Sequence, residues 1–211
     1  MNRFVRLRRL FLLGLLGTVA AAASAETPEA PDQLIKRLSA EVLETIRTDK
    51  EIQAGDTRKV TSLVDGKVMP HVNFTRMTAS AVGRSWRQAT PEQQKRLQEE
   101  FKALLVRTYS GAISQVKDQT VSVKPLRAGP ADTEVIVRSE VVGRGDPIQL
   151  DYRVEKTPTG WRIYDINVLG VWLVENYRTQ FAQEISARGV DGLINSLAER
   201  NKSSALAAKK G

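Results

Sequence analysis

The chain has 211 residues, of which 41% are apolar and 27% are charged, so it is long enough for one well-packed domain or two small ones and is too apolar for a disordered polymer. Its 32 lysine and arginine residues exceed its 24 acidic residues and give a formal net charge of +8. The sequence has no cysteine, which excludes a disulfide scaffold, thiolate metal sites and cysteine nucleophiles. The single histidine, His71, argues against mechanisms that depend on histidine.

The first 25 residues predict a secretory signal peptide that is cleaved from the mature chain. An arginine-rich start precedes an uncharged apolar run, Leu10–Ala23, and residues 23–25 have the small-x-small pattern of a cleavage site. The run has about 14 apolar residues, fewer than the roughly 20 of a membrane-spanning helix, so we favour cleavage over an uncleaved anchor. The pair Arg8-Arg9 keeps a twin-arginine signal open as an alternative to the ordinary secretory route.

The first half of the mature chain predicts helices, because its apolar residues recur at helical spacing. One amphipathic helix is expected from residue 32 to a stop before Gly55. Asp56 is a candidate cap for a second helix, which Pro70 would end, and Asn73 is a candidate cap for a third. Residues 90–93 form a capping box with proline at the first helical position, and this box opens a long helix that runs to residue 113.

The second half changes to the strict alternation that is typical of strands. Strands are expected at residues 121–123, 135–137, 148–154 and 161–168. Helical spacing returns from Val171 to a stop at Gly189, and Asp191 is a candidate cap for a last short helix. We therefore expect a signal peptide at 1–25, a single domain at 26–202 and a disordered tail at 203–211.

This order of elements predicts an α+β fold, with helices packed on a curved antiparallel sheet of about four strands. The strand at 161–168 carries apolar groups on both faces. Trp161 and Ile163 would lie on one face, and Tyr164, Ile166 and Val168 on the other. We therefore expect both faces of the sheet to be covered, which fits either a thick core or an apolar cavity.

Several blocks of sequence resemble one protein family. Residues 161–166 and 170–181 resemble the C-terminal signature of the MlaC or toluene-tolerance (Ttg2) family of periplasmic phospholipid carriers. Residues 70–77 and 82–89 resemble its other recurrent blocks, as do Gln94, Phe101, Leu105, Thr108 and Tyr109 on the long helix. The resemblance covers essentially all of the mature chain in order. One departure is Trp172, where the family pattern leads us to expect a small residue near the pocket.

The resemblance implies a one-domain fold related to nuclear transport factor 2-like cones, with a deep apolar pocket for the acyl chains of a glycerophospholipid. It implies a monomeric periplasmic carrier that catalyses no covalent chemistry and needs no cofactor or metal. Its expected partners are an inner-membrane MCE-type ABC transporter complex and an outer-membrane lipoprotein–porin complex. Traffic between them would support the lipid asymmetry of the outer membrane.

Candidate pocket residues are the apolar side chains that would look into such a cone from its helices and its sheet. They are Phe74, Met77, Val82, Phe101, Leu105, Tyr109, Ile163, Val171, Leu173, Tyr177 and Phe181. Each of them also fits a plain core role, but a hollow cone is lined by residues that would otherwise fill it. For Arg178 we favour an ion pair with Asp165 over a contact with a lipid phosphate.

Two other functions compete with the carrier. A proton-transfer isomerase acting on a small apolar ketone would need a general base and a hydroxyl donor, for which Tyr109, Tyr164, Asp151 and Asp165 are candidates, but no recognised spacing marks them. Nucleic-acid binding is suggested by the pI of about 9.9. However, removing the four arginines of the signal peptide from the 32 basic residues leaves 28 against 24 acidic ones, a net charge of +4. We therefore favour the carrier.

Overall fold

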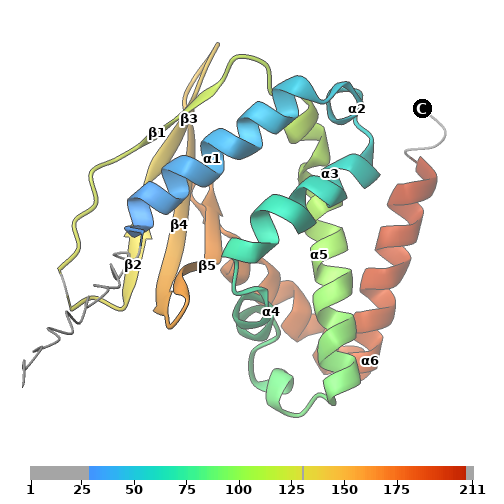
Figure 1. The fold of residues 1–211 in the computed structure, drawn as a ribbon. Helices are drawn as coiled ribbons and strands as arrows, with labels where there is room; N and C mark the ends of the chain where they lie inside the picture. The colour runs from blue at the N-terminus through green and yellow to red at the C-terminus, as the bar shows by residue number, and fades with distance from the viewer. Residues whose placement is uncertain (1–28, 130, 208–211) are drawn as a thin grey trace, which may run out of the picture.

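The structure is a computed structural model that describes residues 29–129 and 131–207. The predicted signal peptide, the first residues of the predicted domain and residues 208–211 of the predicted tail lie outside the described residues. The chain folds as helices packed on an antiparallel sheet (Figure 1). Within the described part, no helix combines the length and the apolar character needed to cross a membrane.

The helices begin where local sequence signals place them. They are α1 (Pro31–Thr48), α2 (Lys50–Gln53), α3 (Thr57–Leu63), α4 (Phe74–Val82), α5 (Pro91–Ser114) and α6 (Leu173–Ala207). The carboxylate of Asp56 accepts hydrogen bonds from two backbone amides at the start of α3, and Asn73 caps α4. Thr90 and Gln93 form the reciprocal capping box of α5. These three predicted caps are confirmed.

Two predicted helices are interrupted in the structure. The first is divided at Asp49, whose side chain accepts hydrogen bonds from the amides of Glu51 and Ile52 and so starts α2. The second continues beyond α3 as a π-helical turn at Val64–Val68 and a 3-10 turn at Met69–His71. Side-chain capping within the predicted helix explains the first break, because it satisfies amides that a new helix would otherwise leave unpaired.

The sheet is antiparallel and has the order β1-β3-β4-β5-β6, with β2 also paired with β4. Its strands are β1 (Thr120–Val123), β2 (Glu134–Val137), β3 (Ser139–Val142), β4 (Ile148–Thr157), β5 (Gly160–Val168) and β6 (Val171–Trp172). β2 and β3 are one strand interrupted at Arg138, since both pair with β4. At this break the Ser139 amide donates to the Asp151 carboxylate at 3.2 Å. The described residues therefore hold the four expected strands together with two that the sequence did not predict, β3 and the two-residue edge strand β6.

A β-bulge in β5 changes which residues share a face. Tyr152 pairs with Ile166, but Val154 pairs with Ile163, so Tyr164 is an extra residue in the ladder. Ile163 and Ile166 therefore lie on the same face of the sheet. The prediction that they lie on opposite faces is wrong, because strict alternation does not survive a bulge.

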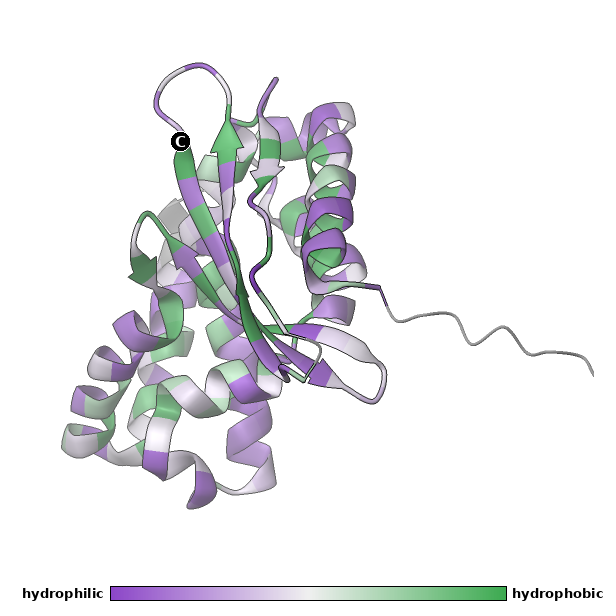
Figure 2. Cartoon of the chain, turned by 90° about the vertical axis from the view of Figure 1, so that its left-hand side faces the viewer, coloured by the Kyte–Doolittle hydropathy of each residue, from purple (hydrophilic) through white to green (hydrophobic). Residues whose placement is uncertain are grey.

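The helices cover one face of the sheet, which we call the inner face; Leu150, Tyr152, Val154, Ile163, Ile166 and Val168 lie on it. Ile35 and Leu38 of α1 pack here against Val137, Tyr152 and Val154. On the outer face Ile136 and its polar neighbours Glu134 and Arg138 are exposed. Figure 2 shows the strands in front of the helices with no described helix over them. The expectation that both faces are covered therefore fails around Ile136, although Asp151, Asp165 and Asn167 on the outer face are buried.

α6 bends sharply at Gly189, which has φ 70° and ψ −175°. The predicted stop is confirmed as a bend, after which the second arm of α6 runs back beside α5 (Figure 1). Asp191, predicted as a cap, accepts a hydrogen bond from the Gln93 side chain at 2.7 Å. The second arm continues to Ala207, so residues 203–207 are helical where the sequence predicts a disordered tail.

Candidate functional site

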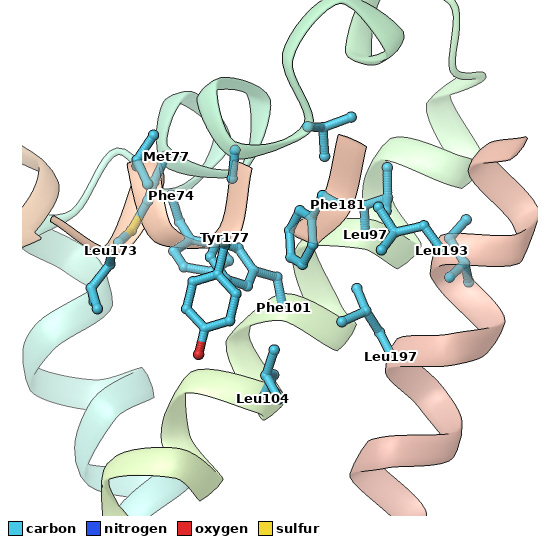
Figure 3. Close-up of a cluster of buried hydrophobic side chains, with 14 residues drawn as sticks. Phe74, Met77, Leu97, Phe101, Leu104, Leu173, Tyr177, Phe181, Leu193 and Leu197 are labelled. Atoms are coloured by element: carbon cyan, nitrogen blue, oxygen red, sulfur yellow. The ribbon is translucent and has the colours of Figure 1, made fainter. Parts of the chain in front are cut away.

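A cluster of buried side chains, which we call the aromatic cluster, joins α4, α5 and α6 beside the sheet. It consists of Phe74, Met77, Ala81, Val82, Leu97, Phe101, Leu104, Leu173, Val174, Tyr177, Phe181, Leu193, Ile194 and Leu197. Phe101 is fully buried at its centre, with its ring centroid 5.0 Å from that of Tyr177 and 5.2 Å from that of Phe181. Both contacts are edge-to-face, a favoured geometry for aromatic pairs. Figure 3 shows these rings between the helices.

Seven of the eleven candidate pocket residues belong to this cluster, and two more border it. Leu105 and Tyr109 of α5 are only partly buried and pack against the cluster from its margin. The other two lie elsewhere. Ile163 is buried under α1, and Val171 is 51% exposed on β6.

The apolar inner face of the sheet extends from the core to the molecular surface. Along β4, Val154 is fully buried, Tyr152 is 8% exposed, Leu150 is partly buried and Ile148 is 44% exposed. The same trend runs across the strands from Leu150. Its partner Val168 on β5 is partly buried, and Val171, which pairs with Val168 from β6, is exposed. A soluble protein usually ends such a face with polar residues, and exposed apolar surface that continues a core often marks a binding site.

Ile166 links this face to both neighbouring cores. It packs against the aromatic cluster and also against the cores of α1 and the sheet, yet it remains partly buried. Val168 and Leu105 are likewise partly buried at the margin of the aromatic cluster. The inner face and α5 therefore present apolar side chains that their own packing does not fully cover.

Asp165 does not pair with Arg178, so that prediction is wrong. Its buried carboxylate pairs with Arg153 at 2.9 Å and accepts the Val174 amide at 3.1 Å, which ties β5 to the first turn of α6. Burial raises the pKa of Asp165, while the backbone amides of Val174 and Ile166 and the Arg153 guanidinium lower it. Arg178 is exposed and lies beside Gly83.

Trp172 does not enter the interior. It pairs with Asn167 in β6, and the Arg153 guanidinium lies 4.0 Å from the centroid of its ring. Arg153 and Asp165 belong to the outer face of the sheet. The Trp172 side chain therefore lies on the outer face of the sheet, whereas the candidate pocket residue Ile163 lies on the inner face.

The candidate residues for an isomerase do not converge. Tyr109 borders the aromatic cluster, whereas Tyr164 donates to Glu134 and Asp165 pairs with Arg153 at the other face of the sheet. Asp151 accepts hydrogen bonds from the Ser139 amide and the Gln149 side chain. In residues 29–129 and 131–207, no three acidic or histidine side chains gather as a metal site would require.

Two hollows lie away from the inner face of the sheet. One, of about 320 Å³, lies between the arms of α6 over Phe181, Leu193 and Leu197. The other, of about 450 Å³, lies at the corner between α1 and α2 and is lined by residues 45 and 48–51. Polar side chains dominate the rim of the first and the lining of the second, so neither resembles a site for hydrocarbon chains.

Comparison with known proteins assigns the chain to a family. Residues 36–199 match the family model described as MlaC protein. The chain belongs to the MlaC family. The resemblance seen in the sequence blocks is therefore confirmed.

Individual members of the MlaC family share the length of this chain. The toluene tolerance protein ttg2D of Pseudomonas putida is 23% identical over 159 residues, which cover 75% of this chain and 74% of that protein. The intermembrane phospholipid transport system binding protein MlaC of Haemophilus influenzae is 20% identical over 168 residues, which cover 78% of each.

A solved structure shares the fold at higher identity. It is the phospholipid-binding protein from Ralstonia solanacearum in complex with a phospholipid, with 50% identity and a TM-score of 0.82. The match covers 84% of this chain and 99% of that chain. The α+β architecture of the MlaC family is thus common to both proteins.

Sequence reasoning did not select three apolar residues of the inner face. The sequence predicts Leu150 only as a strand residue and predicts Ile166 and Val168 on the face opposite to Ile163, whereas the structure places all of them on the inner face. The sequence does contain a signal for Leu150, which alternates with the apolar residues Tyr152 and Val154. The positions of Ile166 and Val168 on the inner face cannot be read from the sequence. The bulge at Tyr164 inserts one residue there without any turn-forming sequence around it.

Proposed function

We propose that this chain is a periplasmic carrier that binds a glycerophospholipid and moves it between membranes without covalent chemistry. Membership of the MlaC family and the phospholipid bound to a homologue of 50% identity carry the proposal. The name of the Haemophilus relative, a binding protein of intermembrane phospholipid transport, supports the same direction.

The energetics of acyl chains explain why such a carrier needs an apolar interior. A diacyl lipid with about 30 methylenes, at roughly 0.8 kcal/mol each, costs on the order of 20 kcal/mol to expose to water. The inner face of the sheet offers apolar surface that helix packing leaves partly uncovered, at Leu150, Ile166 and Val168. We assign the acyl chains to the space that these residues share with Leu105 and Tyr109 of α5.

Release of the lipid requires a partner. The same exposure cost opposes loss of the chains to water, so unloading needs a protein that opens the interior or offers another apolar path. We propose that these partners are an inner-membrane MCE-type ABC transporter complex and an outer-membrane lipoprotein–porin complex. A cleaved signal peptide would deliver the chain to the compartment between them.

Native mass spectrometry of the purified mature chain tests the carrier. We expect a bound mass that organic extraction identifies as phospholipid. Leu105→Trp should abolish this mass, because the larger ring fills space that we assign to an acyl chain. The thermal transition of the variant should stay cooperative, since Leu105 is only partly buried.

The matched control is Ile136→Trp, which adds the same ring on the exposed outer face of the sheet. This variant should retain the lipid. A wild-type protein that binds no phospholipid, even after incubation with vesicles, would contradict the carrier. Full occupancy in Leu105→Trp would remove that residue from the site.

A further inference from the structure

The four tyrosines of the chain differ in how their hydroxyl groups are satisfied. The Tyr164 hydroxyl donates to Glu134 at 2.9 Å, and the Tyr152 hydroxyl lies between Ser39 and Ser139. The hydroxyls of Tyr109 and Tyr177 have no hydrogen-bond partner among the described residues. Buried hydroxyls normally have one, because an unpaired polar group in an apolar environment costs free energy.

Both residues belong to one packing region: Tyr177 is a member of the aromatic cluster, and Tyr109 packs against it from α5. The Tyr177 ring is buried against Phe101, and Figure 3 shows its hydroxyl pointing out of the cluster on the side of Leu104 and Leu173. Burial raises the pKa of the Tyr109 hydroxyl, and the Tyr177 hydroxyl raises it further by a smaller amount. Neither hydroxyl oxygen is sealed from solvent. Both groups are therefore available to a ligand.

The surroundings select the kind of ligand atom. The side chains that pack around Tyr109 are apolar, and no lysine or arginine is among the groups that shift the pKa of Tyr109. A phosphate would lose its hydration there without gaining a cation, which is strongly unfavourable. A neutral carbonyl oxygen suits a phenol donor in such a place. In a diacyl glycerophospholipid, ester carbonyls occur where the hydrocarbon chains join the glycerol.

We propose that the Tyr109 and Tyr177 hydroxyls donate hydrogen bonds to the two ester carbonyl oxygens of the bound glycerophospholipid. The proposal rests on the proposed carrier function and adds to it a preference for ester-linked over ether-linked lipids. The tyrosines thereby hold the lipid at its glycerol junction, with the chains toward the inner face of the sheet and the phosphate outside.

A competition between ester and ether lipids tests this assignment. The mature protein is incubated with vesicles of dipalmitoyl phosphatidylglycerol mixed equally with the diether that has hexadecyl chains and the same head group. Native mass spectrometry then gives the ratio of the two bound lipids. We expect the wild type to prefer the ester lipid by about fivefold for each hydrogen bond. Tyr109→Phe and Tyr177→Phe should each lower the ratio by that factor, and the double variant should bring it near one.

Tyr164→Phe is the matched control, because its hydroxyl serves Glu134 on the other face of the sheet. It should keep the wild-type ratio. Infrared spectra of bound lipid labelled with carbon-13 at its carbonyls give a second readout. The carbonyl band of the wild-type complex should lie at lower frequency than that of the double variant, which tests the hydrogen bonds even where occupancy falls.

The outcomes separate the inference from the carrier function. A wild-type ratio near one, with phospholipid bound, would overturn the ester contacts and leave the carrier intact. Tyrosine variants that bind both lipids more weakly at an unchanged ratio would also overturn them, and would point to the phosphate. A protein that takes up neither lipid would refute both.

Discussion

Tyr152 holds the contact between α1 and the inner face of the sheet. Its ring lies between its cross-strand partners Val137 and Ile166, and its hydroxyl meets Ser39 of α1 and Ser139 of β3. Burial raises the pKa of this hydroxyl from 10.0 to about 12, because the ionised phenolate would lose its hydration. The residue is therefore neutral in the folded chain at any ordinary pH.

This shift predicts a loss of stability at high pH. Since the unfolded phenol ionises near pH 10 and the folded one near pH 12, the contribution is complete below pH 10 and disappears as the pH rises to 12. The free energy of unfolding should fall by about 3 kcal/mol over this range on account of Tyr152. Denaturant titrations of the wild type and Tyr152→Phe measure the difference. Parallel curves for the two proteins would contradict it.

At the scale of elements, the bend of α6 depends on one backbone conformation. Gly189 has a φ of 70° combined with a ψ of −175°, a region that side chains essentially exclude. Gly111, in α5, has ordinary helical geometry and open space around it. The two positions therefore separate the effect of strain from the effect of helix propensity.

Alanine at these two glycines should act in opposite directions. Gly189→Ala should lower the free energy of unfolding by about 1 to 3 kcal/mol, because it strains the bend. Gly111→Ala should raise it by about 1 kcal/mol, because alanine favours the helical state. Equilibrium unfolding in urea measures both. A neutral Gly189→Ala would mean that the arms of α6 can rearrange around the bend.

Elements marked by local chemistry were predictable from the sequence, and elements decided by tertiary pairing were not. The caps at Asp56, Asn73 and Thr90 act within three residues of themselves, so the sequence contains the whole signal. The bulge at Tyr164 depends on the register between β4 and β5, which no local pattern records. The partner of Asp165 was missed for the same reason, because Arg153 lies opposite it on the neighbouring strand β4 and not near it in the sequence.

The candidate site was predictable in part. Helical spacing identified the faces of α4, α5 and α6 that meet around Phe101. It did not distinguish the packed residues of that cluster from those at its margin, because both are equally apolar. Partial burial of Leu105 and Tyr109, the property that makes them candidates for ligand contact, exists only in the folded chain.

At the scale of the whole molecule, the apolar interior is divided. The aromatic cluster and the core between α1 and the sheet meet at partly buried residues, Val72 and Ile166. A third core, around Val60 and Leu63, joins α1, α3 and α5. In the proposed carrier, hydrocarbon chains complete the boundary between the first two cores and so contribute to the stability of the fold.

Removal of the lipid should therefore destabilise the entire domain. A ligand present at a hundred times its Kd adds about 2.7 kcal/mol to the free energy of unfolding, which corresponds to roughly 5 to 10 °C in Tm for a chain of this size. Calorimetry of lipid-stripped protein, before and after incubation with phosphatidylglycerol vesicles, measures the shift. Glycerophosphoglycerol, which has the head group without acyl chains, should leave Tm unchanged. An equal rise with this compound would contradict burial of the chains.

The bend at Gly189 also affects the order in which the protein can fold during synthesis. Leu193, Ile194 and Leu197 pack against rings that begin with Phe74, more than a hundred residues earlier. A nascent chain that still lacks the second arm of α6 therefore leaves one side of Phe101 and Phe181 without packing partners. Contacts of such long sequence separation form late, so folding cannot finish until nearly the whole polypeptide is free.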